Sequence, residues 1–374
     1  MSTGIRVGIT VAWLLVVLLP GAAIAQDKPG SPIDFSLYAH NPVLPRGPEG
    51  AWDSGFVAYG KVIYVDGVFH MFYAGGHNLR DGHSSIGYAT SPDGFTWTKS
   101  PQNPVLDLET EYGIRAAVPV VENDMWILYF TPRQYPGILG GQTILRATAS
   151  TPNGPWIIDQ QAAVERGQPG AWDRLRVVLD DVILTDDGYR LYYTGGAAHP
   201  FTPSGIGMAL SDDGQTWTRF DDPTTTQMLF GSGDPVLVRH NTHGQWDDYF
   251  VWGASVVSGK RGWEMFYSGG QSGPNHEPLL FGIGYAVSED GLHWERYGSA
   301  PALDIDDRAF PDAPWEAWMP SVVVVDDVYY LFYTTFPAGG LDYYDHYSGF
   351  PDTSFNYEIG LATGTISDAG AAAP

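Results

Sequence analysis

Carboxylates that directly follow tryptophans are the side chains of this sequence best suited to chemistry on a ligand. The pairs are Trp52-Asp53, Trp172-Asp173, Trp246-Asp247 and, more loosely, Trp315-Glu316. A carboxylate can donate or accept a proton, and the flat face of an indole suits the C–H surface of a sugar ring. A pair that recurs around a repeating fold can equally belong to the scaffold, because a substrate is asymmetric. Both interpretations stay open for Trp52, Asp53, Asp247 and Glu316.

Asp180-Asp181 is a further acidic pair, and no other repeat has an acidic pair at the equivalent position, directly before the apolar part of its first strand. The pair is expected at the start of a strand, because the apolar segment Val182–Thr185 follows it. Two like charges that are crowded and partly buried raise one pKa toward the working pH, as a proton donor requires. Asp180 and Asp181 are therefore the first candidates for acid–base chemistry, with a solvated turn as the alternative.

Other side chains are candidates for ligand binding. Arg115 is expected to clamp a sugar or a carboxylate, or to pair with Glu111 or Glu122. The remaining binding candidates are His77, His83, His199, His276 and Trp318.

The sequence gives little sign of a metal site. His240 and His243 share a short segment but lack a third ligand at the spacing of a zinc site. Asp304-Ile305-Asp306-Asp307, with Asp312 beyond it, could bind calcium through oxygen ligands. This stretch lacks the glycine-containing pattern of a calcium loop and is predicted to be a charged surface loop. No metal or other cofactor is expected.

The charge balance narrows the range of partners. The chain has 374 residues, with 19 Lys and Arg against 43 Asp and Glu, and a formal net charge of −24. Nucleic acids and anionic membranes need clustered positive charge, so neither is expected as a partner. There is no cysteine, so disulfides do not contribute to the fold.

A short hairpin motif recurs along the chain and organises the elements that must position these side chains. Its copies are SPDGFTW (91–97), STPNGPW (150–156), SDDGQTW (211–217) and SEDGLHW (288–294). Ser and Asp or Asn side chains can cap backbone N–H groups in such a turn, and Gly accepts a positive φ. Apolar and aromatic strand-like segments precede each copy, and no window has the period of an amphipathic helix.

Each repeat is predicted to form a four-stranded antiparallel sheet, and five such sheets make a five-bladed β-propeller. The last unit, from 319 to 366, has three strands only. Residues 35–44 resemble 95–106, since both contain an aromatic strand followed by Asn-Pro-Val-Leu. A strand near Asp34–Tyr38 is therefore expected to complete the fifth blade and close the ring, which protects open sheet edges. Alternation of the strands puts the long connections on one face, where we expect the ligand to bind.

The N-terminus has the features of a secretory signal peptide. Arg6 precedes the apolar run Val7–Leu19, and Ala23-Ile24-Ala25 fits the cleavage rule for small residues. We expect residues 1–25 to be a signal peptide and 26–33 a linker. A single propeller domain over 34–366 and a flexible tail over 367–374 would follow. The mature protein would be secreted or periplasmic, monomeric and free of the membrane.

The blade pattern resembles the five-bladed propeller glycosidases: families 43, 32 and 68, and the related family 130 mannoside phosphorylases. It reads NPVL, then WD, then DG with aromatic residues and GG, and finally IGYA followed by the hairpin. The resemblance implies the propeller fold and carboxylates at the mouth of the ring that cleave a glycosidic bond. The Gly-Val-Glu-Asp-Pro-Arg motif of family 130 corresponds here to Gly113–Val118, which contains no acid.

The expected function is therefore that of an exported glycoside hydrolase-like enzyme with oligosaccharides or polysaccharides as substrates. A carbohydrate-binding propeller without catalysis is the main alternative, because the usual acids of these families are not in their usual places. A glycoside phosphorylase comes third, and a sialidase is a minor alternative because no Arg-Ile-Pro motif occurs.

Overall fold

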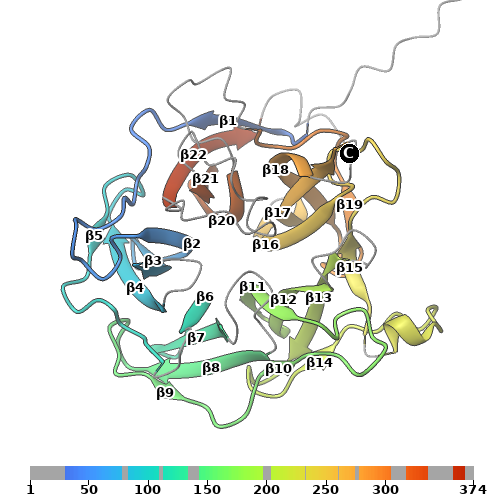
Figure 1. The fold of residues 1–374 in the computed structure, drawn as a ribbon, viewed down its shortest axis with the longest axis horizontal. Coiled ribbons are helices and arrows are strands. Elements are labelled where there is room, and N and C mark those ends of the chain that lie inside the picture. Colours follow the sequence, from blue (N-terminus) through green and yellow to red (C-terminus); the bar gives the residue numbers. More distant parts are fainter. Residues whose placement is uncertain are drawn as a thin grey trace, which may run out of the picture.

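The fold is known from a computed structural model, shown in Figure 1. The structure describes residues 30–77, 83–108, 113–133, 143–196, 204–231, 233–259, 261–273, 278–304, 317–335 and 357–366. The proposed signal peptide, Glu316, His199, His276 and most of the acidic stretch after Asp304 lie outside these residues. Within the described residues, no helix is long and apolar enough to cross a membrane.

Five small antiparallel sheets surround a central axis, which confirms the predicted five-bladed propeller. Blade one contains β2 (Phe56–Val65), β3 (Val68–Gly76), β4 (Ser84–Ser91) and β5 (Thr98–Lys99). Blade two contains β6 (Ile114–Glu122), β7 (Met125–Pro132), β8 (Thr143–Ala149), β9 (Ile157–Ile158) and β10 (Val164–Glu165). Blade three contains β11 (Val177–Thr185), β12 (Gly188–Gly196), β13 (Ser204–Ser211), β14 (Thr218–Arg219) and β15 (Pro235–Val238). Blade four contains β16 (Phe250–Gly259), β17 (Gly262–Ser272), β18 (Pro278–Ser288) and β19 (Glu295–Arg296). Blade five contains β20 (Ala317–Val325), β21 (Val328–Thr335) and β22 (Glu358–Ile366), and a 3₁₀ turn, η1, covers Met228–Phe230.

The N-terminal strand closes the ring, as the sequence predicts. β1 (Ile33–Leu37) pairs antiparallel with β22, with Phe35 opposite Gly364, and becomes the outer strand of blade five. Leu44 then bridges to Ile359 of the same blade. The first and last parts of the propeller therefore share one sheet, and the ring cannot open without breaking these pairs.

The repeated hairpins are built as expected from their side chains. In the first, Gly94 donates its N–H to Ser91 Oγ at 2.8 Å, and Phe95 donates to Asp93 Oδ1 at 2.8 Å. Gly94 has φ +79°, and the indole N–H of Trp97 donates to the Gly94 carbonyl at 2.9 Å. The hairpins at 211–217 and 288–294 repeat the Ser and Asp contacts.

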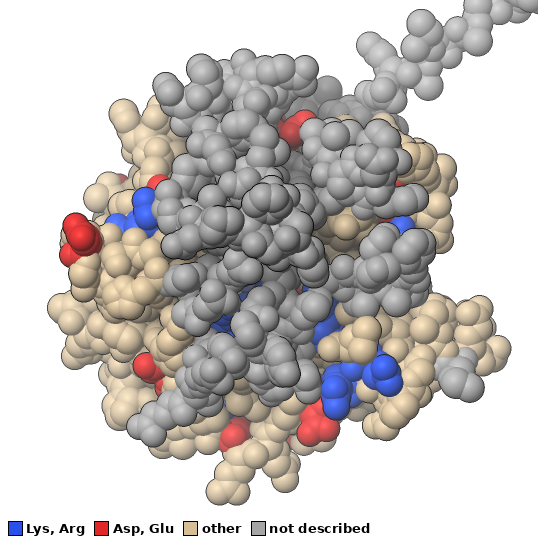
Figure 2. Space-filling view, in the orientation of Figure 1, with Lys and Arg blue, Asp and Glu red and all other residues tan. Residues whose placement is uncertain are grey.

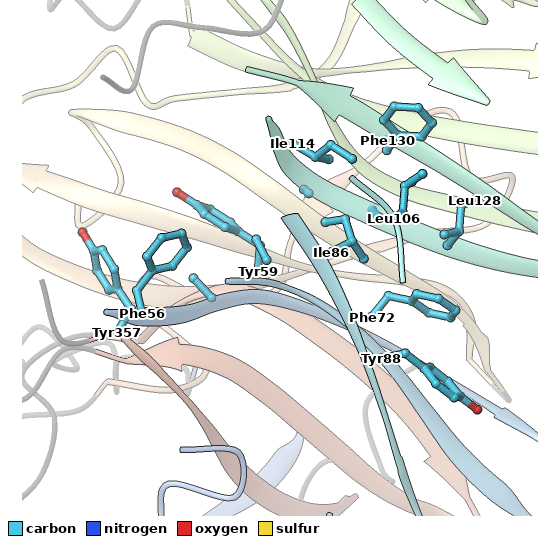
Figure 3. Packing of buried hydrophobic residues seen from close by; sticks show 14 of the residues in the cluster. Phe56, Tyr59, Phe72, Ile86, Tyr88, Leu106, Ile114, Leu128, Phe130 and Tyr357 are labelled. Carbon is cyan, nitrogen blue, oxygen red and sulfur yellow. The ribbon is translucent and has the colours of Figure 1, made fainter. Parts of the chain in front are cut away.

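Apolar side chains fill the space between neighbouring blades. Figure 3 shows the cluster that packs blade one against blade two and continues to blades four and five; Phe56 and, from blade five, Tyr357 lie at one end, and Phe72 and Tyr88 at the other. Tyr59 belongs to the same cluster and is also part of the axial site described below. Burial of one such side chain stabilises the fold by roughly 1.5–3 kcal/mol, so these clusters hold the blades rigidly around the axis.

Candidate functional site

The inner strands are bulged where they pass the axis. In blades one, three, four and five the pairing with the second strand shifts after Ala58, Leu179, Trp252 and Trp318. In blade two the shift comes after Ile114, so that Arg115 is the extra residue. Because a bulge reorients the side chain beside it, each inner strand can present a residue to the axis that regular alternation would turn away.

Asp180 is the extra residue of the β11 bulge and is buried, with 2% exposure. Its carboxylate accepts a hydrogen bond from the hydroxyl of Thr194, whose Oγ1 lies 2.9 and 2.8 Å from the two oxygens. Burial raises the pKa of Asp180 to about 7, against the lowering effects of Lys61 and Thr194. The pair Asp180-Asp181 lies at the fourth and fifth residues of β11, later than the predicted strand start. The strand begins earlier because Val177–Leu179 pair with β12 and are buried.

Lys61 crosses the axis from blade one. Its ammonium group donates to the carbonyl oxygens of Ala254 at 3.0 Å and Pro320 at 2.9 Å, which belong to the bulges of blades four and five. Burial lowers the pKa of Lys61, while Asp181 and Asp180 raise it. The centre of the ring therefore contains the buried Lys61 cation, the buried carboxyl group of Asp180 and the partly buried carboxyl group of Asp181, and desolvation raises the pKa of both acids.

Asp181, the residue after Asp180, links the inner strands of blades three and four. Its two oxygens accept the backbone N–H groups of Val182 at 2.9 Å and Val256 at 2.7 Å. Ser255 and Ser321 occupy the equivalent positions of the next blades and accept the N–H groups of Val322 and Val62. In blade two this donor position is Pro119, which has no N–H. The N–H groups of Val182, Val256, Val322 and Val62 thus each have a side-chain acceptor, and the fifth position is a proline without an N–H. Asp181 accepts two of these four hydrogen bonds.

A second set of hydroxyl groups links the blades three residues earlier along the inner strands. The inner-strand N–H groups of Leu179, Gly253, Met319 and Tyr59 donate to Thr131, Thr194, Ser268 and Thr334 of the preceding blade, at 2.7–3.0 Å. Blade one has Ala74 at this position. Thr194 therefore has two roles, since it fixes blade four and contacts Asp180.

A small pocket lies at the axis, near the starts of the inner strands. All five blades contribute to its wall. It is lined by Tyr59, Arg115, Arg176, Val178, Thr194, Trp252, Trp318 and Met319. Its free volume is about 10 Å³, space for about one water molecule. The rings of Tyr59 and Trp252 lie 6.0 and 5.9 Å from that of Trp318, so they form a contiguous aromatic wall. In Figure 2, some Lys and Arg side chains are visible beside the grey atoms near the centre of the view.

The sequence prediction found some of this site and missed the rest. Arg115 and Trp318 were predicted to bind ligand, and both line the pocket. Lys61, Thr194, Arg176 and Trp252 were not identified. Lys61 carried a signal, because a lysine within the apolar strand Phe56–Val65 needs a buried partner.

The repeated Trp-Asp pairs lie elsewhere, in contacts that join strands of one blade. In blade one, Trp52 stacks on Tyr73 at 5.8 Å, and Asp53 accepts hydrogen bonds from the Tyr73 hydroxyl at 3.1 Å and Lys99 at 2.6 Å. The same arrangement recurs in blades three and four with Trp172, Asp173, Tyr193 and Arg219, and with Trp246, Asp247, Tyr267 and Arg296. Lys99, Arg219 and Arg296 all come from the outer strand of their blade. These contacts favour the scaffold interpretation of Trp52, Asp53 and Asp247.

Neither described candidate histidine lines the axial pocket. His77 Nδ1 contacts Ser54 Oγ at 3.2 Å, and His83 pairs with Asp107. Arg115 makes no ion pair with Glu122, and Glu111 lies outside the described residues. Among the described residues no group of three His, Cys, Asp or Glu side chains is placed to hold a metal ion.

Comparison with known proteins supports the propeller assignment. No family model matches the chain. The chain is 33% identical over 125 residues to the β-1,2-mannobiose phosphorylase of Thermoanaerobacter sp. strain X514, a match that covers 30% of this chain and only 38% of that protein.

Solved structures of similar fold come from the same group of enzymes. A glycosyl hydrolase from Bacteroides ovatus superposes with a TM-score of 0.63 at 15% identity, over 88% of this chain and 93% of that one. A thermostable family 43 glycoside hydrolase gives 0.57 at 17% identity, over 84% and 91%. A structure from family 130 gives 0.61 at 15% identity, over 88% and 93%; that family of mannoside phosphorylases contains glycoside hydrolases that target β-1,2-mannosidic linkages in Candida mannan. The fold is thus that of the five-bladed glycosidase and phosphorylase propellers, and the expected resemblance is confirmed.

Proposed function

We propose that this protein is a carbohydrate-active enzyme that binds an oligosaccharide over the axial pocket and cleaves a glycosidic bond there. The observation that carries the proposal is Asp180, a carboxyl group with a pKa of about 7 that is hydrogen-bonded to Thr194 in the wall of an aromatic pocket. A proton donor with a pKa near the working pH is what departure of a sugar oxygen requires. Tyr59, Trp252 and Trp318 supply the aromatic faces on which a sugar ring can stack.

Proton transfer would follow the contact between Asp180 and Thr194. Thr194 lines the pocket and its hydroxyl contacts Asp180. In the protonated form Asp180 would donate its proton to Thr194 Oγ1 while the Thr194 hydroxyl proton passes to the glycosidic oxygen, directly or through one water molecule. Asp181 is a poor nucleophile, because both of its oxygens accept backbone N–H groups. For the second carboxylate Glu316 remains a candidate, since it precedes Trp318 by two positions in the chain.

Two other functions have an observation in their favour. The described wall of the pocket includes no carboxylate, which favours a carbohydrate-binding propeller without catalysis. Two arginines in the wall and the partial match to a mannobiose phosphorylase favour cleavage by phosphate instead of water.

The test is a product assay on purified protein with β-mannosides, arabinosides and xylosides, each with and without inorganic phosphate. Release of free sugar without phosphate supports hydrolysis, and sugar 1-phosphate formed only with phosphate supports phosphorolysis. Asp180→Asn should lower kcat by about 10²-fold or more. Sugar binding that Trp252→Ala abolishes, without turnover of any glycoside, would leave the binding propeller as the function.

We also propose that the protein is exported and that the mature chain begins at Gln26. The basic, apolar and small-residue segments of 1–25 support this proposal. Intact mass of protein from the native host is the measurement, and a mass that includes residues 1–25 would contradict it.

A further inference from the structure

The charge of the axial pocket is opposite to that of the protein. The chain as a whole carries −24, yet the charged side chains in the described pocket wall are Arg115 and Arg176. Beneath them the charge of Lys61 offsets that of the two aspartates, of which Asp180 is partly protonated at neutral pH. A ligand at this place therefore meets local positive charge in a protein that is otherwise acidic.

Arg115 is the more informative of the two arginines. It is 6% exposed, and its contact is with the ring of Tyr59, whose centroid lies 5.8 Å from the guanidinium carbon. Within the part of the chain that the structure describes, it forms no ion pair or side-chain hydrogen bond. Burial of an arginine without an anion is costly, so its position in the pocket wall points to an anionic group in the ligand.

Other arginines of the protein show what an arginine with a structural role looks like. Arg146 pairs with Asp159 at 2.7 Å, Arg219 with Asp173 at 3.1 Å and Arg296 with Asp247 at 2.7 Å. Each of them has a carboxylate partner within its own blade. Arg115 differs from all three, because its guanidinium faces the pocket.

Arg176 adds a second cation from another blade. It is 2% exposed and lies over the ring of Trp252, with 5.6 Å between the guanidinium carbon and the ring centroid. Stacking on an aromatic face limits the rotation of a guanidinium, and a planar guanidinium suits a planar, charged acceptor. Both arginines are thus presented beside the aromatic surfaces that would hold a sugar ring.

On the basis of the proposed function, we propose that the substrate is an acidic saccharide, whose uronate carboxylate binds Arg115 and Arg176. A uronic acid uses both parts of the pocket, because its ring stacks on Tyr59, Trp252 or Trp318 while its carboxylate meets the guanidinium groups. Free phosphate would use the arginines alone and leave the aromatic wall unoccupied. The chemistry of the wall therefore favours an anion that is attached to a sugar ring.

Titration calorimetry on the full mature chain tests this proposal. The probes are glucuronate and galacturonate with their di- and trisaccharides, the neutral glucose and galactose counterparts, and inorganic phosphate. At least one uronate should bind 10-fold or more tightly than its neutral counterpart. Arg115→Gln should weaken that binding by about 10- to 100-fold and leave neutral saccharides unaffected, the usual range for a hydrogen bond to a charged group.

Variants separate charge, geometry and folding. Arg115→Lys keeps the charge but loses the planar fork, so it should lie between wild type and Arg115→Gln. Arg176→Gln should weaken uronate binding as well. Arg166, which is exposed and outside the pocket wall, provides the matched control Arg166→Gln with unchanged binding. Melting temperature shows whether each variant is folded.

The outcomes are distinct. Equal affinity for uronates and neutral saccharides, or uronate binding that neither Arg115→Gln nor Arg176→Gln weakens, would overturn the acidic-saccharide proposal while the proposed function stands. Phosphate binding that requires both arginines, with no uronate preference, would overturn it in favour of phosphorolysis. Absence of binding by all of these probes, alongside cleavage of a neutral glycoside in the product assay, would overturn this inference alone. Absence of both binding and cleavage would overturn the proposed function together with it.

Discussion

Thr194 Oγ1 lies within 2.9 Å of both carboxylate oxygens of Asp180 and also accepts the Gly253 N–H at 3.0 Å. One hydroxyl group therefore connects the buried acid of blade three, the backbone of blade four and the pocket wall. Removal of the hydroxyl in Thr194→Val keeps the shape of the side chain but breaks both contacts. We expect a loss of about 1–3 kcal/mol in the free energy of unfolding, because the Gly253 N–H loses its acceptor. Urea denaturation checks this, and Thr218→Val, at an exposed site, is the control.

Asp180 should make stability depend on pH. Its pKa is about 7 in the folded protein and near 3.8 as an isolated group, so the folded state keeps a proton that the unfolded chain loses. Its contribution to stability is fully present below about pH 4 and is lost as the pH rises to about 7. Between pH 4 and 7 the melting temperature of Asp180→Asn should therefore fall less steeply than that of the wild type.

Asp213→Asn provides the control for this pH series. The pKa of Asp213 is lowered to about 2 by the backbone N–H groups of Thr216 and Gln215, so its contribution is present above about pH 4 and is lost below that. Its curve should run parallel to that of wild type from pH 4 to 7. A parallel curve for Asp180→Asn as well would show that Asp180 is ionised throughout this range.

Lys61 should be essential for stability although it lies in an apolar strand. Lys61→Met removes the two hydrogen bonds to Ala254 and Pro320 and leaves the aspartates without a nearby cation. Loss of one partner from a buried charge group costs about 3–5 kcal/mol, which denaturant unfolding would measure. The double change Lys61→Met with Asp180→Asn should cost less than the sum of the single changes. Strict additivity would mean that the two charges do not interact.

The Trp-Asp contacts should affect stability and spare function. Asp247→Asn weakens the contacts with Tyr267 and Arg296, so we expect a loss of about 1–3 kcal/mol in unfolding free energy with unchanged saccharide binding and kcat. The same result is expected for Asp53→Asn. A 10²-fold loss of kcat with stability unchanged would instead return these residues to the list of catalytic candidates.

Ring closure by β1 can be tested by deletion of residues 30–44. This removes the outer strand of blade five together with the buried side chains of Ile33, Val43 and Leu44, each worth roughly 1.5–3 kcal/mol. The melting temperature should drop by well over ten degrees, or the shortened chain should fail to fold. An unchanged melting temperature would mean that β1 adds nothing to the closed ring.

The architecture was predictable because it repeats. Each hairpin carries its own capping residues, such as Ser91 and Asp93, and the similarity between residues 35–44 and 95–106 located the closing strand. Repetition also motivates the scaffold interpretation of Trp52-Asp53, and the structure shows the same contact in three blades.

The site was less predictable because bulges interrupt the alternation of the inner strands. Strict alternation cannot place Arg115 or Asp180 at the axis, since each is the additional residue of its strand. Arg176 and Trp252 come from different blades and are separated by 76 positions, so only the packing of blade three against blade four brings them within 5.6 Å. Their pairing could not be derived from spacing along the chain.

The joint between blades one and two differs from the other four in a way that bears on how the ring can deform. Ala74 and Pro119 remove both hydroxyl-to-amide links near the axis. An apolar cluster and side-chain contacts farther along the joint remain, among them Ser84 with the Ile114 carbonyl at 2.6 Å and Ser100 with Asn153 at 2.7 Å. Directional bonds resist a change of angle, whereas apolar contacts tolerate small sliding. A ligand slightly too wide for the axis would thus be accommodated by a tilt of blade two against blade one, and Arg115 would move with it.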